Sequence, residues 1–158
     1  MTKILFICHG NICRSPMAEF LFKALLKSAG LADSCFVESA AVSSEEVGNP
    51  IYPPARQCLS RHNVWYDPDK RARQLVWADY DRFDRLICMD ASNLRLIRII
   101  IPDDPDGKIQ LMMSYAGVAR DVADPWYTGD FEKTFQDLQL ACRALAGKIS
   151  ATGIIPLR

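Results

Sequence analysis

The hydrophobic positions of this chain follow two patterns that alternate along its length. Short apolar runs that end in turn residues are typical of buried strands, and they occur at residues 3–7, 34–40, 85–89 and 109–113. Amphipathic stretches that predict helices lie at residues 17–29, 53–61, 91–100 and from 131 to a cap at Gly147. Strands alternating with helices imply parallel strands joined by right-handed crossovers. We therefore expect one α/β domain over residues 1–158: a doubly wound fold with a central four-stranded parallel sheet flanked by helices.

The first predicted helix has clear local signals. Ser15 suits the N-cap, and Pro16 suits the first helical position, where a missing N–H costs nothing. Glu19, Lys23 and Lys27 recur every four residues. We expect these three side chains to form one solvated stripe on an otherwise apolar helix.

Composition excludes several classes of protein. The 19 basic and 19 acidic residues cancel, which argues against a nucleic-acid or membrane-surface binder. No apolar run approaches the roughly 18 residues that span a bilayer, and the N-terminal run is too short for a secretory signal. The six cysteines are scattered without a Cys-x-x-Cys pair, as in reduced proteins. We therefore expect a cytoplasmic protein with no membrane insertion. We expect a monomer, or weak self-association if Trp126 and Tyr127 are exposed.

One stretch combines residues that are used in anion chemistry. Residues 8–16, Cys-His-Gly-Asn-Ile-Cys-Arg-Ser-Pro, join the first strand to the first helix. A loop this short can turn its backbone N–H groups inward, where they and the helix dipole bind an anion. Arg14 can hold two phosphoryl oxygens at once, and positive surroundings favour the nucleophilic thiolate of Cys8. The sequence therefore predicts in-line attack by Cys8 on phosphorus, giving a phosphocysteine.

Other residues of the stretch fit a phosphate-binding loop. Asn11 tolerates left-handed backbone and can tie the loop together through its amide, while Ser15 could donate its hydroxyl to the thiolate. An incidental cysteine at a strand end is the alternative, and it leaves the combination of residues unexplained. With only His9 and His62 as histidines, a histidine-rich metal site is not expected. Because the loop amides and Arg14 supply the charge that a metal would provide, we expect no metal and no cofactor. The predicted loop residues besides Cys8 and Arg14 are His9, Gly10, Asn11, Ile12, Cys13 and Ser15.

These residues resemble the signature of the low-molecular-weight protein tyrosine phosphatases. The resemblance continues at residues 38–40, 71–74, 83–94, 124–127 and 141–145. It implies hydrolysis of phosphotyrosyl proteins or peptides, and of small aryl phosphates, with release of inorganic phosphate. By this resemblance Cys8 is the nucleophile, Arg14 binds phosphate, and Asp124 is the general acid and then the base. A turn-forming Asp before Pro is the alternative for Asp124.

The resemblance also implies the walls of a substrate cleft. Trp126 and Tyr127 would present flat faces to a phenyl ring, in a cleft deep enough to exclude phosphoserine. Glu45 and Glu46 stand where the family often has an aromatic residue and then His or Asn. An acidic wall would disfavour acidic peptides, and two solvated glutamates that touch nothing are the alternative.

Two further residues are interpreted through the resemblance. Lys70 stands where the family often has histidine, so a pair between Lys70 and Asp90 would preserve a structural contact; a solvated lysine is the alternative. Cys13 matches a cysteine that can form a reversible disulfide with the nucleophile Cys8, which would make the enzyme redox-sensitive. A small residue facing the core is the alternative for Cys13.

Three rival functions fit parts of the pattern. Arsenate reduction on this scaffold needs a relay cysteine pair near the third strand, where Cys88 stands alone. A phosphotyrosine-binding module would not need both a nucleophile and an acid, and a phosphocysteine relay would not need Asp124. Hydrolysis is therefore the function that we expect.

Overall fold

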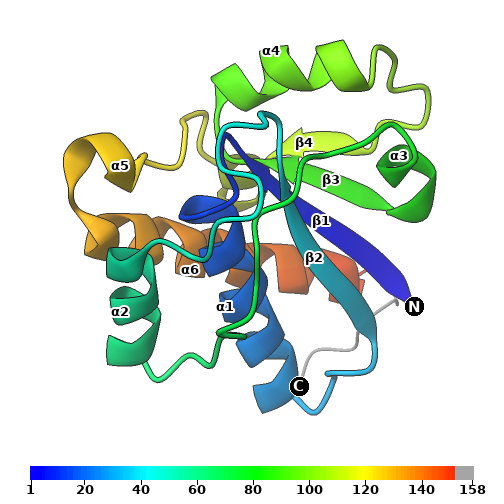
Figure 1. Ribbon diagram of the computed structural model, residues 1–158. Coiled ribbons are helices and arrows are strands. Elements are labelled where there is room, and N and C mark those ends of the chain that lie inside the picture. The colour runs from blue at the N-terminus through cyan, green and yellow to red at the C-terminus, as the bar shows by residue number, and fades with distance from the viewer. Residues whose placement is uncertain (152–158) are drawn as a thin grey trace.

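The sheet has the predicted architecture. The computed structural model describes residues 1–151, so the end of the expected domain at residue 158 lies outside the described residues. Four parallel strands lie in the order β2-β1-β3-β4 (Figure 1). The strands are β1 (Thr2–Cys8), β2 (Cys35–Ala41), β3 (Arg85–Cys88) and β4 (Ile109–Leu111).

Helices cover both faces of the sheet, as a doubly wound fold requires. The helices α1 (Arg14–Ser28), α2 (Pro53–Arg61) and α6 (Phe131–Ala151) lie on one face, and α3 (Asp79–Arg82) and α4 (Ala91–Ile100) on the other (Figure 1). Alternate residues of β1 point to opposite faces. Phe6 therefore joins the core beneath α1 and α6, while Ile7 joins the core beneath α4. The strand is apolar throughout because both of its faces are buried.

The pairing register places the carboxyl ends of three strands side by side. Cys8 of β1 pairs with Ala41 of β2, Ile7 pairs with Cys88 of β3, and Cys88 pairs with Leu111 of β4. Loops that leave these strands therefore meet at one edge, where ligands bind in open parallel sheets.

Several predicted boundaries were wrong for local reasons. The helix α1 begins at Arg14 with Cys13 at its N-cap, so Ser15 is helical and does not cap it. The helix α6 runs on through Gly147 to Ala151, because a single glycine inside a packed helix costs only about 1 kcal/mol. The fourth strand ends at Leu111, where a 3₁₀ helix, η1 (Met112–Ala116), begins.

Two short helices were not predicted. The helices α3 and α5 (Pro125–Thr128) span four residues each, too few for an amphipathic period to be visible in the sequence. Within residues 1–151, no helix is both long and apolar enough to cross a membrane.

Candidate active site

The loop between β1 and α1 surrounds the sulfur of Cys8. The side chain is almost fully buried at the end of β1. The backbone N–H of Asn11 donates to Cys8 Sγ at 3.3 Å, and Ser15 Oγ lies 3.0 Å from the same sulfur. Ser15 can face the loop because it lies in the first turn of α1. The structure thus brings Cys8, Asn11 and Ser15 together.

Asn11 joins the loop to its neighbours. Its φ of 61° is left-handed, a conformation that asparagine adopts more easily than most residues. Its Nδ2 donates to Ser15 Oγ at 2.8 Å and to Ser39 Oγ at 2.9 Å, and its Oδ1 accepts from the Arg73 backbone N–H at 3.1 Å. These bonds connect the loop to the end of β2 and to the segment after α2.

Arg14 is buried, and its guanidinium is held from two sides. Its Nη1 donates to Asp90 Oδ2 at 2.7 Å and to the Val122 carbonyl oxygen at 3.1 Å, and its Nη2 donates to Asp124 Oδ2 at 3.2 Å. Burial alone would lower the pKa of Arg14, but the negative charges of Cys8, Asp124 and Asp90 outweigh it and raise that pKa. The guanidinium therefore stays cationic beside the sulfur of Cys8.

Asp90 connects Arg14 to α4. It is the N-cap of α4, and its Oδ1 accepts the Asn93 backbone N–H at 2.7 Å. Asn93 Oδ1 accepts the Asp90 backbone N–H in return, which completes a capping box. The second carboxylate oxygen of Asp90 is thereby aimed at Arg14.

Asp124 both caps a helix and faces the site. Its Oδ1 accepts the Trp126 backbone N–H at 3.0 Å, which makes it the N-cap of α5. Its Oδ2 contacts Arg14, and 28% of its side chain is exposed. The turn-forming role expected of an Asp before Pro is therefore present together with a position in the cleft.

A cleft of about 530 Å³ contains these groups. Its floor is the loop at residues 8–14, one wall is Glu45 and Glu46, and the other is Asp124, Trp126 and Tyr127. Asn11 and Ser15 are buried behind the residues that line the cleft. The sequence missed two residues of α4 that also line the cleft, Ser92 and Asn93.

The acidic wall contacts the loop directly. Glu45 Oε2 lies 3.0 Å from His9 Nε2, and Glu46 Oε2 accepts from Asn49 Nδ2 at 2.6 Å. A Cβ atom at Gly10 would come within 3.1 Å of Glu46 Cγ, so this wall packs closely against the loop. The interpretation of two glutamates that touch nothing was wrong.

The aromatic wall rests on a residue that the sequence did not single out. Trp126 and Tyr127 are exposed, and the Trp126 ring lies 5.0 Å from that of Tyr52. Tyr52 in turn stacks on Phe131. A tyrosine just before the paired prolines of α2 carries no signal of this role.

The predicted pair between Lys70 and Asp90 was wrong. Lys70 Nζ lies 3.2 Å from Glu19 Oε1 and donates to the Ser39 carbonyl oxygen at 3.3 Å, while Asp90 is held by Arg14. The solvated alternative was also wrong, because only 15% of the Lys70 side chain is exposed. Lys70 therefore joins Glu19 to the backbone of Ser39, whose side chain contacts Asn11 of the loop.

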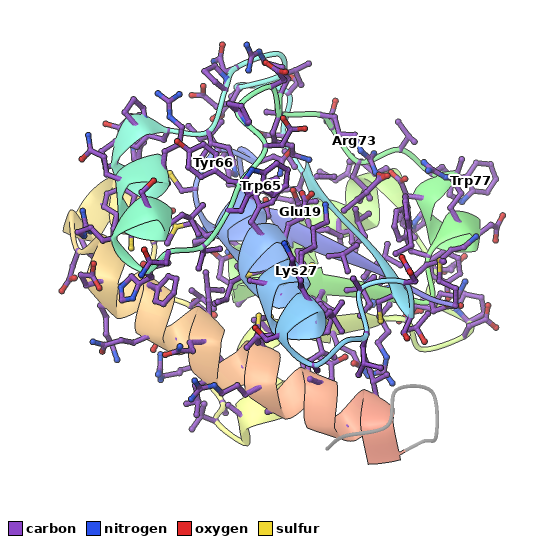
Figure 2. All side chains as sticks on the ribbon, turned by 90° about the horizontal axis from the view of Figure 1, so that it is seen from below. Glu19, Lys27, Trp65, Tyr66, Arg73 and Trp77 are labelled. Atoms are coloured by element: carbon purple, nitrogen blue, oxygen red, sulfur yellow. The ribbon has the colours of Figure 1, made fainter. Side chains whose placement is uncertain are left out.

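Glu19 was wrongly placed in a solvated stripe. Its side chain is 5% exposed and accepts from Ser39 Oγ at 2.6 Å and from Lys23 Nζ at 2.6 Å. Figure 2 shows Glu19 and the exposed Lys27 on the same helix, α1. Ser39 thus connects Glu19 to Asn11 in the loop.

Cys13 lies in the cleft as a buried thiol. Burial, together with the negative charges of Cys8 and Asp124, raises its pKa well above the usual range, so it is protonated. It packs against Ile12 and Ala72. A disulfide with Cys8 stays a prediction.

Comparisons with known proteins point to one family. The family model described as "Low molecular weight phosphotyrosine protein phosphatase" matches residues 3–153. A low molecular weight protein-tyrosine-phosphatase of Bacillus subtilis is 36% identical over 151 residues, covering 94% of this chain and 96% of the relative. The human low molecular weight phosphotyrosine protein phosphatase is 37% identical, covering 92% and 94%.

Solved structures agree with these relatives. The crystal structure of YfkJ from Bacillus subtilis has a TM-score of 0.91 at 35% identity, covering 96% of each chain. A Drosophila structure titled as an arginine phosphatase has a TM-score of 0.82 at 30% identity, covering 93% of this chain and 97% of that one. The fold and the sequence of this chain are therefore similar to those of one group of proteins.

Proposed function

Because this chain belongs to the low molecular weight phosphotyrosine protein phosphatase family, a family of hydrolases, we propose that Cys8, Arg14 and Asp124 carry out its reaction. The observation that supports this proposal is their convergence. The nucleophilic sulfur lies at the floor of one cleft, and Arg14 contacts the carboxylate of Asp124 at its edge. The substrates are phosphotyrosyl proteins or peptides, and small aryl phosphates as well.

The first chemical step forms a phosphocysteine. The phosphoryl oxygens bind the loop N–H groups and Arg14, and this releases Asp124 Oδ2 to face the leaving oxygen. The thiolate of Cys8 attacks phosphorus in line, and the phosphorus–oxygen bond to the tyrosine breaks. Protonated Asp124 gives its proton to the departing phenolate.

The second step releases inorganic phosphate. Asp124, now a carboxylate, takes a proton from a water molecule that attacks the phosphocysteine. The sulfur–phosphorus bond breaks, and the thiolate of Cys8 forms again. Ser15 Oγ, 3.0 Å from the sulfur, stabilises that thiolate by donating a hydrogen bond.

A comparison of variants tests these roles. Cys8→Ser should release no phosphate from p-nitrophenyl phosphate. Asp124→Ala should lose roughly 10²–10⁴-fold with a poor leaving group such as phosphotyrosine, and much less with p-nitrophenyl phosphate, whose leaving group needs little protonation. Asp103→Ala, which makes the same charge change at an exposed residue outside the cleft, is the control. An active Cys8→Ser variant would refute the nucleophile assignment.

The acidic wall gives a prediction about peptide choice. Glu45 and Glu46 place negative charge beside the cleft, so basic phosphotyrosyl peptides should be preferred over acidic ones at low salt. Glu45→Gln and Glu46→Gln together should reduce that preference several-fold in kcat/KM. Asp69→Asn together with Asp103→Asn, at two exposed residues outside the cleft, removes the same two negative charges and is the control. An identical preference in the double variant would retire the proposal.

Phosphoarginine is the second candidate substrate, because one structural neighbour is titled an arginine phosphatase. The exposed faces of Trp126 and Tyr127 favour an aryl group instead. Measuring kcat/KM for phosphotyrosine and phosphoarginine peptides of one sequence decides between them. A higher value for phosphoarginine would contradict the tyrosine assignment.

The proposal extends to the setting of the enzyme. We expect residues 1–158 to act as one phosphatase domain in the cytoplasm, without a cofactor and as a monomer or in weak self-association. The cysteines of the described chain are free thiols, which suits a reducing compartment. Under oxidants, a disulfide between Cys8 and Cys13 would protect the nucleophile, and a thiol reductant should restore activity.

A further inference from the structure

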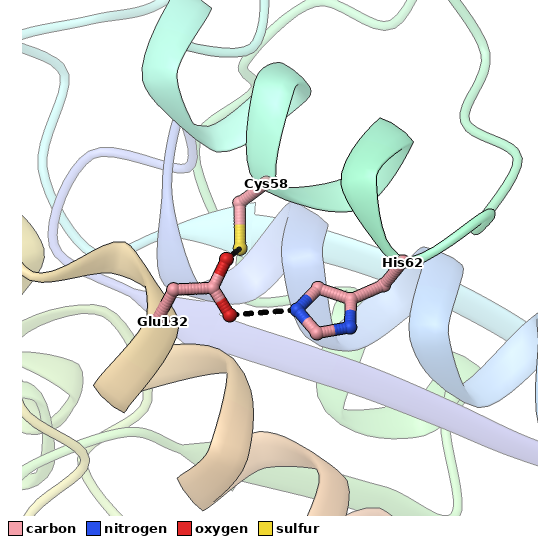
Figure 3. Close-up of side chains that lie close together, drawn as sticks. All are labelled: Cys58, His62 and Glu132. Carbon is pink, nitrogen blue, oxygen red and sulfur yellow. Dashed lines mark hydrogen bonds and ion pairs between the residues drawn. The ribbon is translucent and has the colours of Figure 1, made fainter.

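A second cluster of reactive side chains lies away from the cleft, where α2 ends and α6 begins. Cys58 and His62 lie four residues apart, one helical turn, and Glu132 reaches them from the first turn of α6 (Figure 3). His62 Nε2 lies 2.7 Å from Glu132 Oε2, and Cys58 Sγ lies 3.7 Å from Glu132 Oε1. One donor atom from each residue lies within 4.8 Å of the others.

The surrounding structure fixes these donors. The His62 ring stacks on Phe135, with a centroid distance of 3.9 Å and an interplanar angle of 9°. Cys58 is fully buried, and its Sγ also points at the Phe131 carbonyl oxygen at 3.6 Å. The side chains of His62 and Glu132 are 37% and 43% exposed. The cluster therefore has a rigid inner side and an open outer side.

We propose that Cys58, His62 and Glu132 bind a divalent transition-metal ion of the Zn²⁺ type. A thiolate sulfur, an imidazole nitrogen and a carboxylate oxygen form a donor set that suits Zn²⁺, with water in the fourth position on the open side. The site lies at the C-terminal end of α2, where the helix dipole favours positive charge, and at the N-terminal end of α6, where the dipole opposes it, so the donor atoms and not the dipoles carry the proposal. Binding releases the thiol proton of Cys58 to solvent.

The geometry requires only a small adjustment. Tetrahedral Zn²⁺ with ordinary bond lengths would place sulfur and oxygen about 3.6 Å apart and nitrogen and oxygen about 3.4 Å apart. Cys58 Sγ is 3.7 Å from Glu132 Oε1 and His62 Nε2 is 2.7 Å from the other oxygen, Oε2, so the carboxylate must turn until one of its oxygens meets both separations. A rotation of the exposed Glu132 carboxylate can supply this change.

Arg61 is the group that competes with the metal. Its Nε and Nη2 donate to Glu132 Oε1 at 3.0 and 2.8 Å. These bonds leave Oε2, the oxygen nearest His62, available to the ion. They also place a positive charge beside it, which weakens binding. The affinity of the site is therefore set partly by Arg61.

This site differs from the sequence expectation of no metal. A metal site built from histidines needs more than the two histidines of this chain. A mixed donor set needs only one histidine, and Glu132 stands seventy-four residues from Cys58, so the sequence gives no spacing motif that would reveal it.

Binding of Co²⁺ and Zn²⁺ to the full chain, stripped of metal with a chelator, tests the proposal. Co²⁺ should give a thiolate-to-cobalt charge-transfer band with one ion per chain, and Zn²⁺ should displace it. The band should persist in Cys8→Ser, which removes the active-site thiol as an alternative ligand, and disappear in Cys58→Ser. Glu132→Gln should weaken Zn²⁺ by more than the roughly 10–100-fold that losing an outer partner costs.

Arg61→Ala supplies a variant that should improve the site. Removing the positive charge of Arg61 should tighten Zn²⁺ binding. If the pair of Arg61 with Glu132 is only structural, the substitution should leave Zn²⁺ binding unchanged. Circular dichroism of each variant checks that it folds. If Cys58→Ser does not fold, Glu132→Gln, a change at the surface, serves as the test variant instead. A band that survives in Cys58→Ser, or that vanishes in Cys8→Ser, overturns the proposal, as does the absence of one-to-one binding by the unaltered chain.

Discussion

Asn11 shows how one residue can determine the shape of the phosphate loop. Its left-handed backbone turns the chain, and its side chain makes three hydrogen bonds, to Ser15, Ser39 and the Arg73 backbone. Both properties are local, but the partners come from three parts of the chain. The loop is therefore held in place before any phosphate binds.

Replacing Asn11 should cost more than the backbone strain alone. Asn63 is a matched control, because it is also left-handed, with φ of 56°, but exposed. We expect Asn63→Ala to lower the free energy of unfolding by about 1 kcal/mol. Asn11→Ala should lower the free energy of unfolding by about 2–3 kcal/mol more, because the buried groups that bond the Asn11 side chain lose their partner. Urea unfolding measures both, and equal losses would contradict a role for the side-chain bonds.

Single residues also show where sequence reasoning fails. The positions of Cys8 and Arg14 in one cleft were predictable from the loop between them, and that of Asp124 from the family resemblance. The burial of Glu19 was not, because its partners Ser39 and Lys70 lie in distant segments. A charged residue at helical spacing is usually solvated, and only tertiary contacts reverse that rule.

At the scale of elements, the segment before α5 is fastened to α6. Arg120 donates to both carboxylate oxygens of Asp137 on α6, at 2.9 and 2.8 Å, and Lys133 Nζ lies 3.2 Å from Asp137 Oδ1. The Asp137 side chain is 2% exposed. This contact anchors the segment that leads to Asp124, whose short helix was itself too small to predict.

The contact of Asp137 with Arg120 and Lys133 should make the free energy of unfolding depend on pH. Burial alone would raise the pKa of Asp137, but the hydrogen bonds from Arg120 and Lys133 outweigh it and lower that pKa. A group with a lowered folded-state pKa stabilises above its unfolded value of about 3.9 and loses this effect as pH falls through the folded value. Asp137→Asn should therefore cost roughly 2 kcal/mol near neutral pH.

The pH profile of that variant is the decisive measurement. In urea unfolding, the difference between Asp137→Asn and the unaltered chain should shrink as pH falls below about 4. Asp130→Asn, on an exposed residue near the start of α6, should not show the same loss at neutral pH. A difference that stays constant down to low pH would show that charge is not the cause.

At the scale of the whole molecule, the sheet determines where the chemistry can occur. The hydrophobic periodicity of the sequence predicts the alternation of strands and helices, and the fold was predicted correctly for that reason. The register was not readable, yet it is the register that places Cys8 beside the ends of β2 and β3. The clefts and clusters between elements, including Cys58 with Glu132, depend on this packing and leave no linear pattern.

The loop at residues 8–14, α1 and α4 together form the anion-binding site. Phosphate should therefore bind the folded chain and not the unfolded one. Saturation to 100 times the dissociation constant adds about 2.7 kcal/mol of stability, which raises Tm by about 5–10 °C for a chain of this size. Thermal unfolding with inorganic phosphate measures the shift. Cys8→Ser should keep it, because the N–H groups and Arg14 remain, and Arg14→Gln should lose it. A shift that survives without the guanidinium would mean that the anion binds elsewhere, and that Arg14 acts through Asp90 and Asp124 alone.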